Sequence, residues 1–141
     1  MSAPGSSVRY RSTRGSAPEV TFEEALLQGL APDGGLYLPT ALPPADASWR
    51  RATHPAEVAA AVLPPLLGTA ASDVEAVFRD ALGFPLPVVA VDEDLYVLEL
   101  FHGPTAAFKD VGARAMARLM DAALARRGRT ATVLVATSGD T

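Results

Sequence analysis

The sequence has no cysteine, only two histidines and only one lysine, and these scarcities narrow its chemistry. The lack of cysteine excludes disulfide bonds, thiolate metal sites and a thiol nucleophile. His54 and His102 are too few and too far apart in the sequence to suggest a metal cage, so we expect no metal site. No apolar run approaches the roughly 18 residues that a membrane-spanning helix needs. The N-terminus lacks the apolar segment of a secretory signal, so we expect a cytoplasmic protein.

Positive charge is scarce as well, because 12 Lys and Arg residues stand against 16 Asp and Glu residues, for a net charge of -4. A negative chain is repelled by phosphate backbones and by anionic lipids, so we expect neither nucleic acid nor a membrane as partner. Hydrophobic residues make up 49% and charged residues 20%, a balance typical of a folded globular chain.

The single lysine, Lys109, is the most informative residue, because every other Lys or Arg position holds arginine. Arginine does not lose its proton in proteins, so it cannot act as an amine nucleophile, whereas a lysine with a lowered pKa can. Lys109 is therefore a candidate for covalent amine chemistry. The alternative is a solvated surface lysine in a sequence whose coding bias disfavours lysine.

The first half of the chain predicts a small α+β domain over residues 1–85. A short strand is expected within 8–13 and an extended piece at 36–39, after the turn signal Pro-Asp-Gly-Gly. Capping boxes at 21–24 and 72–75 predict the starts of two helices, which glycines at 29 and 83 help to end. A further helix is expected from Pro55 to about 63, where two prolines stop it, and residues 40–54 read as a loop.

The second half predicts the start of an α/β domain over residues 86–141. Residues 88–91 and 95–100 read as a hairpin, 110–127 as an amphipathic helix and 130–136 as a buried parallel strand. The expected buried face of the helix consists of Ala115, Met116, Leu119, Met120, Ala123 and Leu124. Strand, loop, helix and strand make one right-handed crossover unit, which leaves its sheet open. We therefore expect an N-terminal piece of a longer protein.

Two loops combine residues that suit ligand chemistry. Lys109 falls where the helix dipole disfavours a cation, and Phe101 and Phe108 are either apolar walls around it or core residues. Residues 137–141, TSGDT, offer hydroxyls and consecutive backbone N–H groups, which suit a carboxylate or simply cap a helix. Because ligands of open α/β sheets bind at the carboxyl ends of strands, we expect the two loops to form one site.

These segments resemble the threonine synthase family. Residues 99–110, ELFHGPTAAFKD, are similar to its lysine segment, and residues 135–141, VATSGDT, to its substrate-carboxylate loop. The N-terminal matches are 10–15, YRSTRG, 20–26, VTFEEAL, and 29–37, GLAPDGGLY. The family commonly has a leucine where this chain has Ala106, a small departure.

The resemblance implies a pyridoxal-phosphate enzyme of fold type II, like the β subunit of tryptophan synthase, which makes threonine from O-phosphohomoserine. It implies covalent attachment of the cofactor to Lys109 and proton transfer by that amine. The implied cofactor-binding residues are Lys109, Phe108 and Asp140. The implied substrate-binding residues are Thr137, Ser138, Gly139 and Thr141. His102 and Thr105 are further candidates, and we expect a monomer or a homodimer.

Two alternatives remain open at this point. The first is a sister enzyme of the same fold, such as a threonine dehydratase or a cysteine synthase. The second is a binding protein without catalysis. The residues that would cradle the cofactor phosphate and pair with its pyridine nitrogen lie beyond Thr141, so we expect residues 1–141 alone to be inactive.

Overall fold

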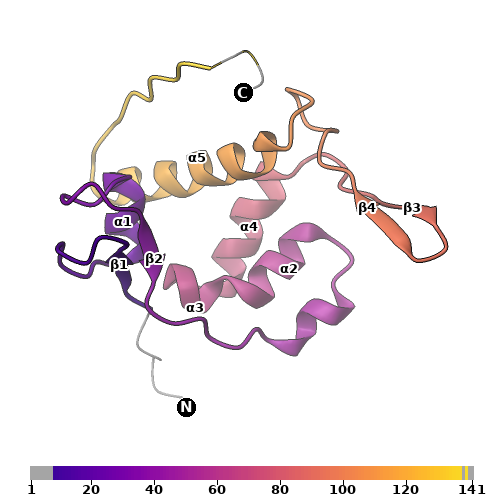
Figure 1. The fold of residues 1–141 in the computed structure, drawn as a ribbon, viewed down its shortest axis with the longest axis horizontal. Coiled ribbons are helices and arrows are strands. Elements are labelled where there is room, and N and C mark those ends of the chain that lie inside the picture. The colour runs from indigo at the N-terminus through magenta and orange to yellow at the C-terminus, as the bar shows by residue number, and fades with distance from the viewer. Residues whose placement is uncertain (1–7, 138, 140–141) are drawn as a thin grey trace. The chain divides into compact units, whose positions relative to one another are not determined.

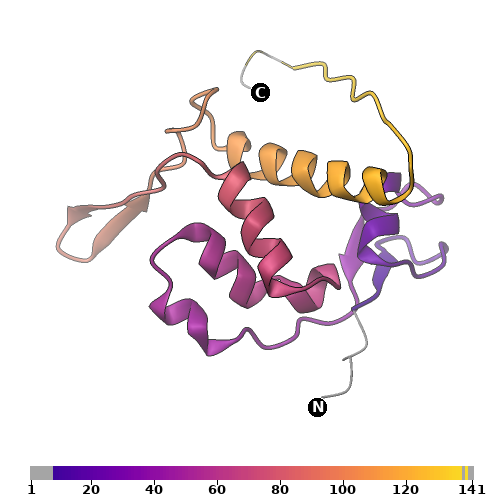
Figure 2. The same cartoon turned by 180° about the vertical axis from the view of Figure 1, so that it is seen from behind.

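The computed structural model describes residues 8–137 and 139, which fall into two compact units, Met1–Ala76 and Val77–Thr141. Figure 1 labels most of the helices and strands of both units, and Figure 2 shows the same ribbon from behind.

The first unit is organised around a short antiparallel pair, β1 (Tyr10–Ser12) with β2 (Tyr37–Pro39). Between them lies α1 (Phe22–Gln28), which begins with the predicted capping box. The Glu24 backbone N–H donates to the Thr21 hydroxyl at 3.2 Å, and the Glu24 carboxylate accepts from the Thr21 backbone N–H at 2.8 Å. Local sequence alone therefore places this helix correctly.

The segment after β2 contains three short helices, of which the sequence predicts one. The predicted helix is α2 (Pro55–Val62), and the others are η1 (Ala47–Arg51), within the expected loop, and α3 (Pro64–Leu67). The prolines at 64 and 65 do end α2, but they also start α3, since proline suits a first helical turn. His54 caps α2, because its Nδ1 accepts from the Ala56 backbone N–H at 3.0 Å. Histidine is not a common N-cap residue, so this cap was missed.

The capping box expected at 72–75 is wrong. Helix α4 (Ala71–Ala81) begins earlier, so Ser72 lies inside it. The backbone N–H groups of Asp73 and Val74 both donate to the Ala70 carbonyl, at 3.1 Å each. The Ala70 carbonyl thus accepts the first hydrogen bonds of α4, and Ser72, the second residue of the helix, does not occupy the N-cap position.

Asp33 fastens the loop after β1 to the turn before β2. Its carboxylate accepts a hydrogen bond from the Ser12 hydroxyl at 2.6 Å, and one from each backbone N–H of Ser16, Ala17 and Gly35 at 3.0 Å. Ser12 is only 3% exposed. The turn predicted from Pro-Asp-Gly-Gly is therefore present, and its aspartate also serves as an acceptor for residues far along the chain.

This arrangement predicts a loss of stability in acid. The Ser12 hydrogen bond and the three backbone hydrogen bonds lower the pKa of Asp33 from 3.8 to about 2. Because the folded pKa is below the unfolded one, the ionised carboxylate stabilises the fold fully above about pH 4, and this contribution is lost as the pH falls toward about 2. We expect Asp33→Asn to flatten the pH dependence of the unfolding free energy between those values.

Urea denaturation at several pH values measures this effect. Asp94→Asn, at an exposed position in the turn of the second unit, is the matched control and should keep the wild-type slope. A wild-type slope in Asp33→Asn would show that the hydrogen bonds to Asp33 do not govern acid stability.

The second unit combines a hairpin with a long helix. Strands β3 (Val88–Asp92) and β4 (Leu95–Leu98) pair antiparallel, as predicted, and α5 (Lys109–Arg126) differs from the predicted helix by one residue at each end. A small core forms where the end of α4 meets α5, with Ala81, Leu82 and Ala115 buried. The Arg114 guanidinium donates from Nε to the Ala81 carbonyl at 2.7 Å, which satisfies a carbonyl at the end of α4.

Only part of the expected buried face of α5 is covered. Ala115 and Ala123 are buried, whereas Met116 is 45% exposed, and Leu119, Met120 and Leu124 are half-buried. Among the described residues, too few apolar side chains pack on α5 to cover the whole of its expected buried face.

The predicted parallel strand at 130–136 is not formed. Residues 129–137 have no regular secondary structure, and Val133, Leu134 and Val135 are 61%, 91% and 65% exposed. Figure 1 draws this yellow segment as an extended trace beyond α5. A parallel strand forms only by hydrogen bonding to a neighbouring strand, and the described residues provide none beside it. The mixed α/β content is thus as expected, but the described residues hold two antiparallel pairs and no parallel sheet.

Candidate functional site

Lys109 lies where the sequence places it, at the first residue of α5 and just after the loop that leaves β4. Phe108 is the N-cap residue, and it has helical backbone angles and no side-chain cap. The side chain of Lys109 is half-buried. Lys109 therefore lies at the positive end of the α5 helix dipole.

The loop before Lys109 is a series of turns closed by hydrogen bonds. The Ala106 backbone N–H donates to the Gly103 carbonyl at 3.0 Å, and that of Asp110 donates to the Ala107 carbonyl at 3.1 Å. Ala106 has a φ of 56°, in the left-handed region where a side chain costs about 1–2 kcal/mol. The turns thus hold a backbone conformation that alanine does not favour.

Asp110 is the buried anchor of this loop. It is 6% exposed, and its Oδ2 accepts from the Thr105 backbone N–H at 2.8 Å and from the Thr105 hydroxyl at 3.0 Å. The sequence indicates only that an acidic residue suits a helix start, and the link back to Thr105 was missed. A threonine five residues before an aspartate does not by itself predict such a contact, because the contact depends on the path of the turn between them.

His102 pairs with Glu99, which no sequence prediction included. Its Nε2 lies 2.6 Å from the Glu99 Oε2, and the Phe101 ring stacks on the imidazole at a centroid distance of 4.6 Å. The three-residue spacing between Glu99 and His102 was the sequence signal that could have predicted this pair. The carboxylate orients the imidazole, and an oriented imidazole suits a proton-transferring or anion-binding role.

The two phenylalanines near Lys109 are not core residues. Phe101 is 52% exposed and Phe108 is 65% exposed. Among the described residues, therefore, neither ring is part of a core, although Phe101 stacks on His102. Whether they act as walls around the amine stays a prediction.

The second loop is described only in part. Ser138, Asp140 and Thr141 lie outside the described residues, so their expected roles stay predictions. The Gly139 backbone N–H donates to the Thr137 hydroxyl at 3.0 Å, and Thr137 is exposed. Among the described residues, no hydrogen bond joins this loop to the loop before Lys109. The expected meeting of the loops requires a parallel sheet, which those residues do not form.

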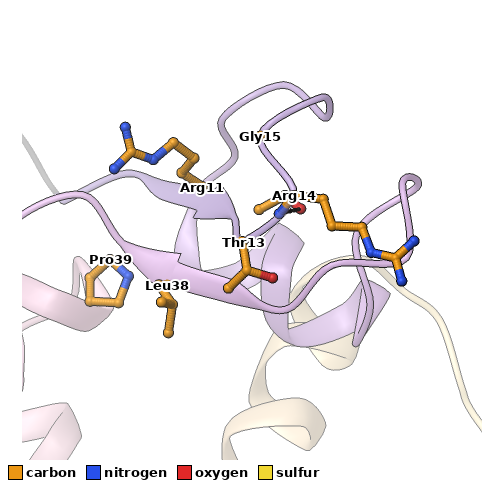
Figure 3. Close-up of a pocket in the computed structure, with 7 residues that line it drawn as sticks. Arg11, Thr13, Arg14, Gly15, Leu38 and Pro39 are labelled. Atoms are coloured by element: carbon orange, nitrogen blue, oxygen red, sulfur yellow. Dashed lines mark hydrogen bonds between the residues drawn. The ribbon is translucent and has the colours of Figure 1, made fainter.

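A pocket of about 570 Å³ lies in the first unit, away from these residues in the sequence. It is lined by Arg11, Ser12, Thr13, Arg14, Gly15, Leu38 and Pro39. In Figure 3 the Arg11 and Arg14 side chains extend in opposite directions. The Arg14 guanidinium also donates to the Asp33 carbonyl at 3.1 Å, so the two cations do not converge on a common anion.

The residues around Lys109 fit the expected cofactor in one respect. A cofactor aldehyde condenses only with a primary amine, and Lys109 supplies the chain's single lysine amine, at the start of α5. The described residues contain no cluster of three or more His, Asp or Glu side chains that could hold a metal ion. Over the same residues, no helix combines the length and apolarity needed to cross a bilayer.

Comparison with known proteins identifies relatives over most of the chain. Residues 9–81 match the family described as threonine synthase N terminus. A threonine synthase from Pseudomonas aeruginosa is 41% identical over 145 residues, which cover 95% of this chain and 31% of that protein.

Two solved structures are similar as well. One is a PLP-bound threonine synthase from Brucella melitensis, with a TM-score of 0.79, 49% identity and coverage of 86% of this chain and 28% of that one. The other is a threonine synthase from Escherichia coli, with a TM-score of 0.75, 32% identity and coverage of 82% and 28%. The chain therefore spans less than a third of the length of the relatives it matches.

Proposed function

The chain belongs to the threonine synthase family. From this premise we propose that the full-length protein, in which this chain is joined to the remainder of the family's length, is a threonine synthase. It converts O-phospho-L-homoserine and water to L-threonine and phosphate. The observation that carries the proposal is the position of Lys109, the chain's single lysine, at the start of α5 and shortly after the family's FHGPT segment at residues 101–105.

The proposed cofactor is pyridoxal phosphate, which supplies an electron sink for carbanions formed next to the substrate's amino group. The support is the PLP-bound structure of the Brucella melitensis threonine synthase, which aligns with 86% of this chain. Lys109 would hold the cofactor through its amine, with Phe108 and Asp140 beside it. The residues that bind the cofactor's phosphate and its pyridine nitrogen are expected in the part of the family's length that this chain does not cover.

The chain's own residues would divide the remaining work between binding and proton transfer. The hydroxyls and backbone N–H groups of Thr137, Ser138, Gly139 and Thr141 would bind the substrate carboxylate, since such groups suit an anion. The Lys109 amine, once the substrate has displaced it, would move protons between adjacent carbons. His102, oriented by Glu99 at 2.6 Å, is suited to bind or protonate the leaving phosphate.

Assays of the full-length protein with three substrates test this function. We expect phosphate and threonine to be released from O-phosphohomoserine, with little turnover of threonine or O-acetylserine. A protein from which the cofactor has been removed is the control, and it should recover activity on reloading. Turnover of only threonine or O-acetylserine would identify a sister enzyme of the same fold. Cofactor binding without any turnover would identify a binding protein.

Residues 1–85 would form the family's N-terminal domain, and residues 86–141 would begin the cofactor-binding domain of fold type II. We place the protein in the cytoplasm as a monomer or a homodimer, and sedimentation of the full-length protein would distinguish these two states.

A further inference from the structure

We propose that Asp110 is a positioning residue for Lys109, which acts through Thr105 to fix the turn that delivers the lysine to the start of α5. The inference rests on the proposed function of Lys109. It concerns a residue that would touch neither the substrate nor the cofactor.

The burial of Asp110 is the first observation. An acidic side chain in a first helical turn needs no partner beyond the helix dipole and water, and such residues are normally exposed. Asp110 is instead 6% exposed, and its Oδ2 accepts two hydrogen bonds from a residue five positions earlier, at 2.8 and 3.0 Å. A buried carboxylate requires such bonds, so removing either partner leaves polar groups unpaired.

The space around the carboxylate is the second observation. A Cβ atom added to Gly103 would lie 2.5 to 2.9 Å from three side-chain atoms of Asp110. The Gly103 main chain therefore packs directly against the carboxylate, and only glycine permits this approach. Asp110 thus contacts the loop at two places, Gly103 and Thr105, on either side of Pro104.

The backbone of the turn is the third observation. Ala106 keeps a φ of 56° between the Thr105 hydrogen bonds and the hydrogen bond from its own N–H to the Gly103 carbonyl. Without the Asp110 carboxylate, one side of this turn is released and Ala106 can relax to a negative φ. Lys109 follows three residues later, so relaxation would change where its amine is presented.

The consequence is a specific role for Asp110 in loading the cofactor. A displacement on the order of 1 Å of a reacting group can cost on the order of a hundredfold in rate. We expect Asp110→Ala to slow borohydride-trappable loading of Lys109 in the full-length protein by roughly that factor. Asp110→Asn should lose less, because its amide oxygen still accepts from Thr105.

Matched variants separate positioning from general loss of stability. Asp121→Asn removes the same charge from an exposed position on α5 and should load at the wild-type rate. Thr105→Val removes one of the two hydrogen bonds and should fall between wild type and Asp110→Ala, while Thr105→Ser should recover most of that loss. The double variant Thr105→Val/Asp110→Ala should be no slower than Asp110→Ala alone, because both changes break the same contact.

Hydrogen exchange in the cofactor-free protein gives a readout that does not depend on the reaction. The Thr105 amide should exchange at least about tenfold faster in Asp110→Ala than in wild type or Asp121→Asn, since its acceptor is gone. If Asp110→Ala does not fold, Thr105→Val and Thr105→Ser still test the inference, because their loading rates can be compared with that of wild type. Additive losses in the double variant, or slow loading without faster Thr105 exchange, would overturn the inference. Loading that persists in Lys109→Ala would instead overturn the proposed function.

Discussion

Replacing Lys109 with alanine is expected to abolish covalent attachment of pyridoxal phosphate to a full-length protein that carries this chain. Lys109 is the chain's single lysine, and the 11 arginines cannot substitute for it, because a guanidinium does not give up its proton. Loss of the proton transfers assigned to this amine should by itself lower kcat by about 10²–10⁴-fold. Lys109→Arg, which keeps the positive charge at the start of α5, should be equally inactive.

The scarcity of lysine makes the measurement unusually direct. A lysine-specific endoproteinase cuts residues 1–141 only after Lys109, and reductive trapping of the cofactor on that amine blocks the cut. We expect borohydride-treated wild-type protein to lack this cleavage, and untreated protein to show it. His102→Gln is a useful companion, because it alters a neighbouring polar group and leaves the amine in place. Cleavage after Lys109 in fully labelled protein would place the label on another residue and refute the assignment.

The parts of the fold that the sequence predicts correctly are those decided by neighbours along the chain. The capping box of Thr21 and Glu24 starts α1, and apolar residues at helical spacing set α5 to within one residue at each end. Lys109 is found at a helix start for the same reason. These features depend on hydrogen bonds and side-chain spacing within a few residues, which the sequence displays directly.

The features that were missed depend on residues far apart or on the path of a turn. The strand expected at 130–136 has the right composition, but a strand exists only with a partner, and the described residues provide none. The positive φ of Ala106 has no signature, because alanine rarely adopts it. The contact between Thr105 and Asp110 follows from that turn, so sequence reasoning found the candidate lysine without finding the contact that we propose to position it.

Replacing Gly35 with alanine is expected to cause the largest loss of stability in the first unit. Gly35 is buried, and a Cβ atom there would overlap the Ser12 hydroxyl and lie 3.0 Å from the Arg14 backbone nitrogen. The Ser12 hydroxyl cannot move aside freely, because it donates to Asp33 at 2.6 Å. Overpacking of this kind costs about 3 kcal/mol, and here it also breaks the contact that joins β1 to the turn.

The adjacent glycine provides a matched control for this substitution. Gly34 has a φ of +77°, and a Cβ atom there would lie 3.4 Å from the Arg14 guanidinium. Gly34→Ala therefore suffers from backbone strain alone, about 1–2 kcal/mol, and Gly34→Asn should suffer less. Urea denaturation of all three variants should rank Gly35→Ala as the least stable.

A Ser12→Ala background tests the steric cause directly, because it removes the atom that the new Cβ would meet first. The additional loss caused by Gly35→Ala should then fall to less than half of its value beside Ser12, even though Ser12→Ala itself weakens the hydrogen bonding of Asp33. An unchanged loss would mean that the crowding comes from the backbone of the Arg14 loop. In that case Gly35 would be required by the path of the chain around Asp33, and the packing of the Ser12 side chain would be incidental.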